Sequence, residues 1–174
     1  LFSKLDLKRV PFHFENIDIV DYLTDCVDEL RFDPNLNGVK INFLYEANDV
    51  TKPLTVVADR EQLRRVIMNI VDNSLKYKQG KTLEIEFELI VGEKDVTIAI
   101  RDNGPGMEKE ALQHIFERFY RAEKSRNAET GGSGLGLAIV KQIIEEHGGK
   151  VWAESQLEKG TTIFFTLKKS NGMK

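Results

Sequence analysis

Cysteine is almost absent from this sequence, which contains one such residue, Cys26, among 174 positions. A single thiol excludes an internal disulfide and is typical of a protein from a reducing compartment. Cys26 lies in helical step with Ile19, Leu23 and Leu30. This spacing predicts that Cys26 is a buried structural thiol and not a nucleophile.

Long apolar runs and an excess of positive charge are also missing. No apolar stretch approaches the roughly 20 residues that a membrane-spanning helix needs. The formal net charge is −3, whereas nucleic-acid-binding domains usually carry a basic surplus. Apolar residues make up 41% of the chain and charged residues 30%, which predicts a globular domain with a sizeable core. We therefore expect no nucleic-acid partner.

Hydrophobic periodicity and turn residues predict the order of helices and strands. Residues 83–89 alternate apolar side chains with glutamates, the pattern of an antiparallel strand covered on one side. Residues 59–77 form a long predicted helix, with Asp59 as N-cap and Gln62 in capping-box position. The other predicted helices are 18–31, 109–115 and 134–147, and the other strands are 12–17, 40–45, 55–58, 96–102, 151–155 and 161–167. The expected fold class is α+β, a two-layer sandwich whose mixed, mostly antiparallel sheet is covered on one face by about three helices.

The segment NIVDNSLKY carries polar residues beside the apolar stripe of the predicted helix 59–77. Asn69, Asn73 and Tyr77 are spaced at i, i+4 and i+8, with Lys76 beside them. An asparagine oxygen is a hard, neutral ligand suited to Mg²⁺, and a lysine is a mobile point charge for phosphate. Taken alone, these residues are equally compatible with a solvated helix face. The apolar stripe consists of Leu63, Val66, Ile67, Ile70 and Ser74.

The segment DNGPG follows the predicted strand 96–102. By parity Asp102 points to the same side as the apolar residues of that strand, where a carboxylate needs hydrogen bonds. An ionised carboxylate only accepts, so its partner must be a donor such as the exocyclic amine of adenine. Gly104 and Gly106 would let the backbone approach a flat base closely. An ordinary turn at the end of a strand remains the alternative.

The segment GGSGLGLAIVKQI leads from glycines into the predicted helix 134–147. Glycines at a helix start offer free N–H groups and the positive end of the helix dipole to phosphate. The segment is not a P-loop, because no Lys-Ser/Thr pair follows the glycines, and it is not a dinucleotide fingerprint, because no strand precedes it. A flexible hinge is the alternative.

Residues 103–132 form about thirty mostly polar and glycine-rich positions, and a loop of this length in a compact domain is usually a functional lid. We expect aromatic residues to anchor this lid and basic residues to face phosphate and a partner helix. The alternative is local packing with a solvated run of charge. The aromatic residues are Phe116, Phe119 and Tyr120, and the basic residues are Arg118, Arg121, Lys124 and Arg126.

The ordered combination is specific where each motif alone is not. It resembles the nucleotide-binding fold that histidine kinases share with DNA gyrase, the Hsp90 chaperones and MutL. The histidine-kinase branch is the closer match. NIVDNSLKY resembles its N box, DNGPG its G1 box, IFERFYR its F box, GGSGLGLAI its G2 box and GTTIFFTL its last glycine motif and strand. LFSKLDLKR resembles the exit from a dimerisation helix, so we expect residues 1–10 to be the end of that helix and a linker, 11–170 the catalytic ATP-binding domain, and 171–174 a tail.

The resemblance implies a site for ATP and Mg²⁺. It implies that Asn73 coordinates Mg²⁺ and that Asp102 binds the adenine amine. Thr161 is implied to support the adenine end, although Glu158 stands where the family often has glycine. The residues implied to line the nucleotide site are Asn69, Asn73, Lys76, Tyr77, Asp102, Gly104, Gly106, Gly132, Ser133, Gly134, Leu135, Gly136, Leu137 and Thr161. The residues implied to act in catalysis are Asn69, Lys76, Arg118 and Arg121, with Arg121 and Arg118 reaching the γ-phosphate.

Position 69 distinguishes branches of this fold. Hydrolytic relatives carry a glutamate there as base toward water, whereas a neutral amide such as Asn69 cannot take a proton from water usefully at pH 7. The resemblance therefore implies a protein-histidine kinase domain that keeps ATP intact. A hydrolytic ATPase module and a non-catalytic, nucleotide-dependent interaction domain are the alternatives.

The acceptor histidine of such a kinase is not evident in the sequence. No His-Glu or His-Asp pair occurs, and we expect structural or surface roles for His13, His114 and His147. The implied partners are a histidine-bearing dimerisation domain of the same parent and, indirectly, a response regulator. The resemblance further implies a cytoplasmic, monomeric fragment of a homodimeric parent, in a family with many membrane-anchored members.

Overall fold

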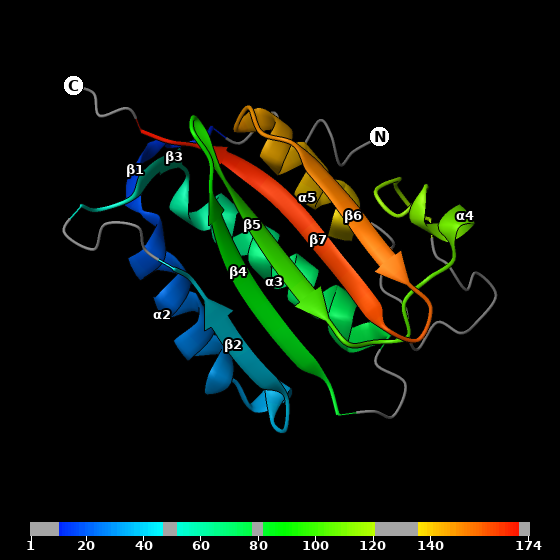
Figure 1. Cartoon of the computed structure of the whole chain (residues 1–174). Helices are drawn as coiled ribbons and strands as arrows, with labels where there is room; N and C mark the ends of the chain where they lie inside the picture. The colour runs from blue at the N-terminus through cyan, green and yellow to red at the C-terminus, as the bar shows by residue number, and fades with distance from the viewer. Residues whose placement is uncertain (1–10, 47–51, 78–81, 121–135, 171–174) are drawn as a thin grey trace.

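The computed structural model describes residues 11–46, 52–77, 82–120 and 136–170 (Figure 1). In chain order the elements are β1 (Glu15–Asp18), α2 (Ile19–Arg31), a 3-10 turn (Pro34–Leu36), β2 (Lys40–Leu44), β3 (Thr55–Ala58), α3 (Arg60–Lys76), β4 (Glu84–Val91), β5 (Asp95–Asp102), α4 (Lys109–Leu112), α5 (Gly136–Glu146), β6 (Val151–Gln156) and β7 (Gly160–Lys168). In the described part of the chain, no helix has the length and apolar character to cross a membrane.

The main sheet confirms the predicted fold class. Its five strands lie in the order β2-β4-β5-β7-β6, and β2–β4 is its parallel pair while the other neighbours are antiparallel. Helices α2, α3 and α5 lie on one face of this sheet (Figure 1). A separate two-stranded sheet joins β1 to β3. The architecture is therefore the expected two-layer sandwich.

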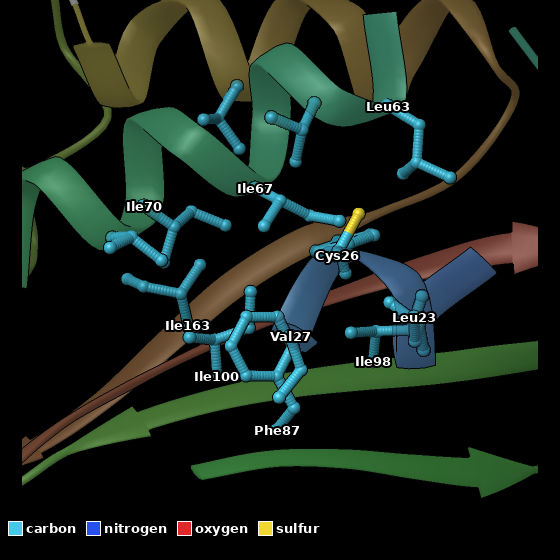
Figure 2. Packing of buried hydrophobic residues seen from close by; sticks show 14 of the residues in the cluster. Leu23, Cys26, Val27, Leu63, Ile67, Ile70, Phe87, Ile98, Ile100 and Ile163 are labelled. Atoms are coloured by element: carbon cyan, nitrogen blue, oxygen red, sulfur yellow. The ribbon is translucent and has the colours of Figure 1, made fainter. Parts of the chain in front are cut away.

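The core lies between the helices and the covered face of the sheet. In β4 the residues Ile85, Phe87 and Leu89 are buried, as the alternation with glutamate predicts. Figure 2 shows Cys26 and other side chains of α2 and α3 packing toward the strands. Cys26 is buried, as predicted, and its burial raises the pKa of the thiol to about 11. It is therefore a packing residue and a poor nucleophile.

The side chains that alternate with the buried ones along each strand lie on the other face of the sheet. The Arg101 guanidinium lies 2.6 Å from a Glu86 carboxylate oxygen and 3.4 Å from one of Glu88. The rings of Trp152 and Phe164 stack with centroids 5.1 Å apart. Because the ion pairs are partly exposed, each stabilises the fold by no more than ~1 kcal/mol. The ion pairs on this face agree with a sheet that is covered by helices on the other side only.

The first turn of α3 is capped differently from the prediction. Asp59 accepts a hydrogen bond from the Gln62 backbone N–H at 3.0 Å, as a capping residue should. The reciprocal half of the capping box is wrong, because the Asp59 N–H donates to Nε2 of His147 at 3.1 Å. Within the described chain, the buried Oε1 of Gln62 has no hydrogen-bond partner. A histidine 88 residues away thus replaces the expected glutamine.

His147 joins α5 to the start of the domain. Its Nδ1 donates to the carbonyl of Ile143 at 2.9 Å, so the ring is neutral with Nε2 as acceptor. Burial lowers the pKa of His147, which favours this neutral form. The rings of Phe12 and Phe14 meet the His147 ring edge-on. The expected structural role of His147 is therefore the one found.

Two further boundaries differ by three residues from the sequence prediction. The predicted strand 12–17 begins only at Glu15, because the His13 N–H donates to the Asp59 carboxylate at 2.7 Å and not to a neighbouring strand. The short helix predicted at 109–115 ends at Leu112 and continues as turns. In the last helix, positions 134 and 135 lie outside the described residues. Its predicted end is confirmed, because Gly148 has a φ of 78° and the Gly149 N–H donates to the Ile144 carbonyl at 2.9 Å.

Candidate functional site

Asp102 lies at the end of β5, where the C-terminal end of α3 and the β6–β7 connection meet (Figure 1). Its Oδ1 accepts hydrogen bonds from the N–H groups of Gly104 at 2.9 Å and Thr161 at 3.2 Å. Its Oδ2 accepts one from the Ser74 hydroxyl at 2.7 Å. The partner on α3 shows that Asp102 points to the helix face, as parity predicts. Three donors offset the cost of placing a carboxylate among apolar residues.

Among the described residues, the donors to Asp102 leave one acceptor position on its carboxylate. A carboxylate offers about four lone pairs, two on each oxygen. Both positions of Oδ1 are used by N–H groups, whereas Oδ2 is used once, by Ser74. The half-buried carboxylate can therefore accept one more hydrogen bond at Oδ2. A ligand amine is a suitable donor for that position.

The turn after Asp102 is held on two sides. The Asn103 side chain accepts from the Glu84 N–H at 2.8 Å and donates to the Thr82 carbonyl at 3.1 Å. On the other side, the Met107 N–H donates to the Ser155 hydroxyl at 2.9 Å. Hydrogen bonds therefore hold the turn to the start of β4 on one side and to β6 on the other.

The glycines of this region serve close backbone packing. Gly106 has a φ of 70°, and a Cβ added there would overlap the carbonyl oxygen of Gln156. Gly160 has a φ of 128°, and a Cβ there would overlap the carbonyl oxygen of Asp102. From the sequence we expected Gly106 to let the backbone approach a flat base. In the structure Gly106 lies against the backbone of Gln156 instead. Glu158 has a φ of 65°, so the position where the family often has glycine is left-handed here as well.

A pair of hydroxyl groups, from Ser155 and Thr161, lies beside Asp102. The Ser155 hydroxyl donates to the Gly160 carbonyl at 3.0 Å and lies 2.7 Å from Oγ1 of Thr161. Ser155 has one proton, and the Gly160 carbonyl uses it. Thr161 must then donate its own proton to Ser155. The buried Thr161 hydroxyl is left with lone pairs and no proton to offer a ligand.

The predicted ligand face of α3 lies next to this cluster. Asn69, Asn73 and Tyr77 are half-buried, and Lys76 is exposed in the last turn of the helix. Asn73 directly precedes Ser74, whose hydroxyl reaches Asp102. The structure therefore brings the C-terminal part of the asparagine stripe to the same end of the sheet as Asp102.

The remaining predicted residues fall into two groups. Leu137 is buried on α5, Gly136 begins that helix, and Arg118 is exposed beyond α4. Five residues lie outside the described part of the chain: Arg121, Gly132, Ser133, Gly134 and Leu135.

The described aromatic residues of the expected lid differ in burial and in contacts. Phe116 is half-buried and packs against the core. The ring of Tyr120 lies 5.2 Å from that of His114. Phe119 is 61% exposed with a φ of 66°, so the prediction that it anchors the lid is wrong for this structure. Its strained backbone turns the ring to solvent.

Sequence reasoning missed Ser74 and Ser155 as residues of the site. Ser74 is the polar member of an otherwise apolar stripe and is buried. A buried hydroxyl needs a partner, and parity had already directed Asp102 toward the helices. Together, these two signals predict a hydrogen bond between Ser74 and Asp102. Ser155 offered no such signal, because its partners lie in turns whose geometry the sequence does not determine.

Comparison with known proteins identifies the class. The family of histidine kinase-, DNA gyrase B-, and HSP90-like ATPases matches residues 58–171, and the chain belongs to this family of nucleotide-binding domains. It is 36% identical over 166 residues to sensor histidine kinase WalK of Bacillus subtilis (strain 168), which covers 95% of this chain and 26% of the relative. It is 39% identical over 169 residues to signal transduction histidine-protein kinase ArlS of Staphylococcus haemolyticus, covering 97% of this chain and 36% of the relative.

Solved structures agree with the sequence relatives. A mycobacterial sensor histidine kinase, MprB, superposes with a TM-score of 0.72 at 26% identity, covering 89% of this chain and 98% of that chain. The chain thus matches nearly the whole of that structure, although it spans only 26% and 36% of the two curated relatives.

Proposed function

We propose that this chain is the Mg·ATP-binding catalytic domain of a sensor histidine kinase, which transfers the γ-phosphoryl group to a histidine on a separate dimerisation domain. The observation that carries the proposal is Asp102, held by Ser74, Gly104 and Thr161 with one acceptor position left at Oδ2. An ionised carboxylate with one remaining acceptor position suits the exocyclic amine of adenine. Kinship with named sensor histidine kinases over 95% of the chain supports the phosphotransfer chemistry.

The donor set fits a magnesium nucleotide. Among the described residues, no group of three or more His, Cys, Asp or Glu side chains could hold a metal ion. Mg²⁺ commonly binds through one or two protein oxygens together with substrate phosphates. In this proposal the Asn73 amide oxygen would hold the ion and Lys76 would pair with phosphate. The ion would supply neutralisation of the phosphate charge.

Asn69 supports a kinase over a hydrolase. The residue is half-buried on the same face of α3 as Asn73. A neutral amide is not a base toward water at pH 7, so the bound ATP should await another nucleophile. Phosphoryl transfer then depends on positioning and charge stabilisation, which Arg118, and Arg121 outside the described residues, would provide.

The same proposal extends to the domain organisation and partners of the parent protein. We place residues 1–10 in the linker from a dimerisation helix, 11–170 in the catalytic domain and 171–174 in a tail. The nearest partner is the histidine-bearing domain of the same parent, which would be a homodimer, and the next is a response regulator. The chain itself would work as a cytoplasmic, monomeric unit.

Calorimetric titration with Mg·ATP tests the proposed site. We expect a Kd in the micromolar range, and a loss of tenfold or more in Asp102→Asn, because a charged hydrogen bond contributes ~1.5–3 kcal/mol. Asn73→Asp should lose a comparable factor, because it adds a negative charge beside the phosphates. Asn16→Asp makes the same change at an exposed position of β1 and should bind as the parent does. Unchanged affinity in both site variants would overturn the assignment.

A further inference from the structure

The hydrogen atoms around Asp102 can be counted from the structure. The Ser74 proton is used on Oδ2 of Asp102, since an ionised carboxylate can only accept. Ser74 is buried in the last turns of α3, so its side chain cannot turn to solvent for another partner. Its oxygen keeps lone pairs and has no proton left. Ser74 also fixes the direction of the remaining lone pair on Oδ2.

The same count applies on the opposite side of Asp102. Ser155 accepts from the Met107 N–H and donates to the Gly160 carbonyl, which leaves it able only to accept from Thr161. The Thr161 proton therefore points at Ser155. The Thr161 N–H is used on Oδ1 of Asp102. Each polar hydrogen counted on Ser74, Ser155 and Thr161 is thus directed at a protein oxygen.

We infer that Ser74 and Ser155 are positioning residues that make the base end of the nucleotide site an acceptor-only surface. This inference rests on the proposed function and adds two residues to it. A base with an exocyclic amine finds oxygens to donate to. A base with a carbonyl at that position meets only oxygens and is rejected, because a buried unpaired acceptor costs more than a missing hydrogen bond.

A purely structural role for Ser74 makes a different prediction. If the hydroxyl only filled space in the apolar stripe, its removal would weaken every nucleotide by the same factor. If it orients Asp102, its removal should weaken only ligands that donate an amine. The ratio of two affinities separates these roles, because a general disturbance of the fold cancels in the ratio.

The experiment is a titration of the full 174-residue chain with three Mg²⁺-bound ligands. They are ATP, purine riboside triphosphate, which lacks the amine, and inosine triphosphate, which carries a carbonyl instead. For the parent we expect ATP to bind about tenfold tighter than the purine analogue, with inosine triphosphate weakest. In Ser74→Ala the preference for ATP over the purine analogue should fall to about a third or less of its parental value.

Ser155→Ala tests the other half of the inference. The Thr161 hydroxyl loses its acceptor and becomes free to donate, so inosine triphosphate should gain relative to ATP. Thr24→Ala is the matched control, because it removes a hydroxyl that donates to the Val20 carbonyl on α2. It should leave all ratios at their parental values.

The outcomes separate this inference from the proposed function. A parent that binds none of the three ligands would overturn the proposed function itself. A parent that prefers ATP, with Ser74→Ala weakening ATP and the purine analogue equally, would overturn the inference alone. Should Ser74→Ala fail to fold, Ser74→Cys keeps the size with a weaker donor. An intermediate preference in that variant supports the inference, and an unchanged preference contradicts it.

Discussion

Asp102 and His147 are two polar side chains whose positions follow from their hydrogen bonds. Asp102 was predictable in direction, because parity along β5 places it with Val96, Ile98 and Ile100. Its partner Ser74 was missed, although a serine in an otherwise apolar stripe and the direction of Asp102 together pointed to this contact. His147 was expected to have a structural role, but its contact with the N-cap of α3 joins residues 88 positions apart.

Protonation of His147 should weaken the fold. Burial lowers its folded pKa, so the unfolded chain binds the proton more readily. The stability is fully present above the unfolded pKa of ~6.5 and is lost as the pH falls from there toward the folded pKa. Groups facing the ring are Asp59, which stays ionised here because N–H donors overcome the effect of burial and lower its pKa, and Glu146. We expect the free energy of unfolding to fall by at most ~1.4 kcal/mol per pH unit in this window.

Urea unfolding of the parent and His147→Gln at pH 7 and pH 5 measures this effect. The variant should lose the His147 part of the pH dependence, because glutamine does not titrate. The control is Asn16→Gln at an exposed position of β1, which adds and removes no titrating group, and it should keep the parental dependence. Equal pH dependence in the parent and in His147→Gln would contradict the assignment.

At the scale of elements, patterns predicted helices and strands well where local chemistry decides them. The strand 55–58 is found as predicted, and Gly148 and Gly149 end α5. Boundaries that depend on distant partners were wrong. The capping box at Asp59 lost its reciprocal half to His147, and the first strand was shortened by the bond between His13 and Asp59. Such bonds join segments far apart in sequence, so no local window contains them.

The turn after β5 gives a prediction at this scale. Gly106→Ala adds a Cβ at positive φ that overlaps the Gln156 backbone, so a shift of the β6–β7 connection is unavoidable. Gly38→Ala is the matched control, since Gly38 has a φ of 86° with no atom within 4 Å of the added Cβ. We expect the control to lose ~1–2 kcal/mol from backbone strain alone and Gly106→Ala to lose at least ~2 kcal/mol more. Thermal or urea unfolding measures the difference, and equal losses would show that the packing argument is wrong.

At the scale of the molecule, the sheet assembles the site from distant segments. The end of α3, the turn after β5 and the start of β7 meet at one end of the sandwich (Figure 1). The ordered motifs predicted this meeting and the fold class. They did not predict the strand order, because the parallel neighbours β2 and β4 are separated in sequence by β3 and α3. The Ser155–Thr161 hydroxyl pair beside Asp102 depends on the turns around β6 and β7, whose geometry the sequence does not determine, and was missed for that reason.

The architecture of the whole molecule does not decide between a kinase and a hydrolase. Both use this fold, so the sheet and the helices do not distinguish them. Under the proposed function, the distinction depends on Asn69 and on a nucleophile that another domain would supply. A domain of this kind should bind ATP and leave it intact until a histidine is presented.

The most direct test follows radioactive γ-phosphate from Mg·ATP, with the chain alone and with the histidine-bearing dimerisation domain of its parent kinase added. The account predicts slow phosphate release from the chain alone. It predicts acid-labile label on the added domain, lost when the acceptor histidine is replaced by glutamine. Rapid release of phosphate by the chain alone, with no label on the added domain, would contradict the account and identify a hydrolytic ATPase.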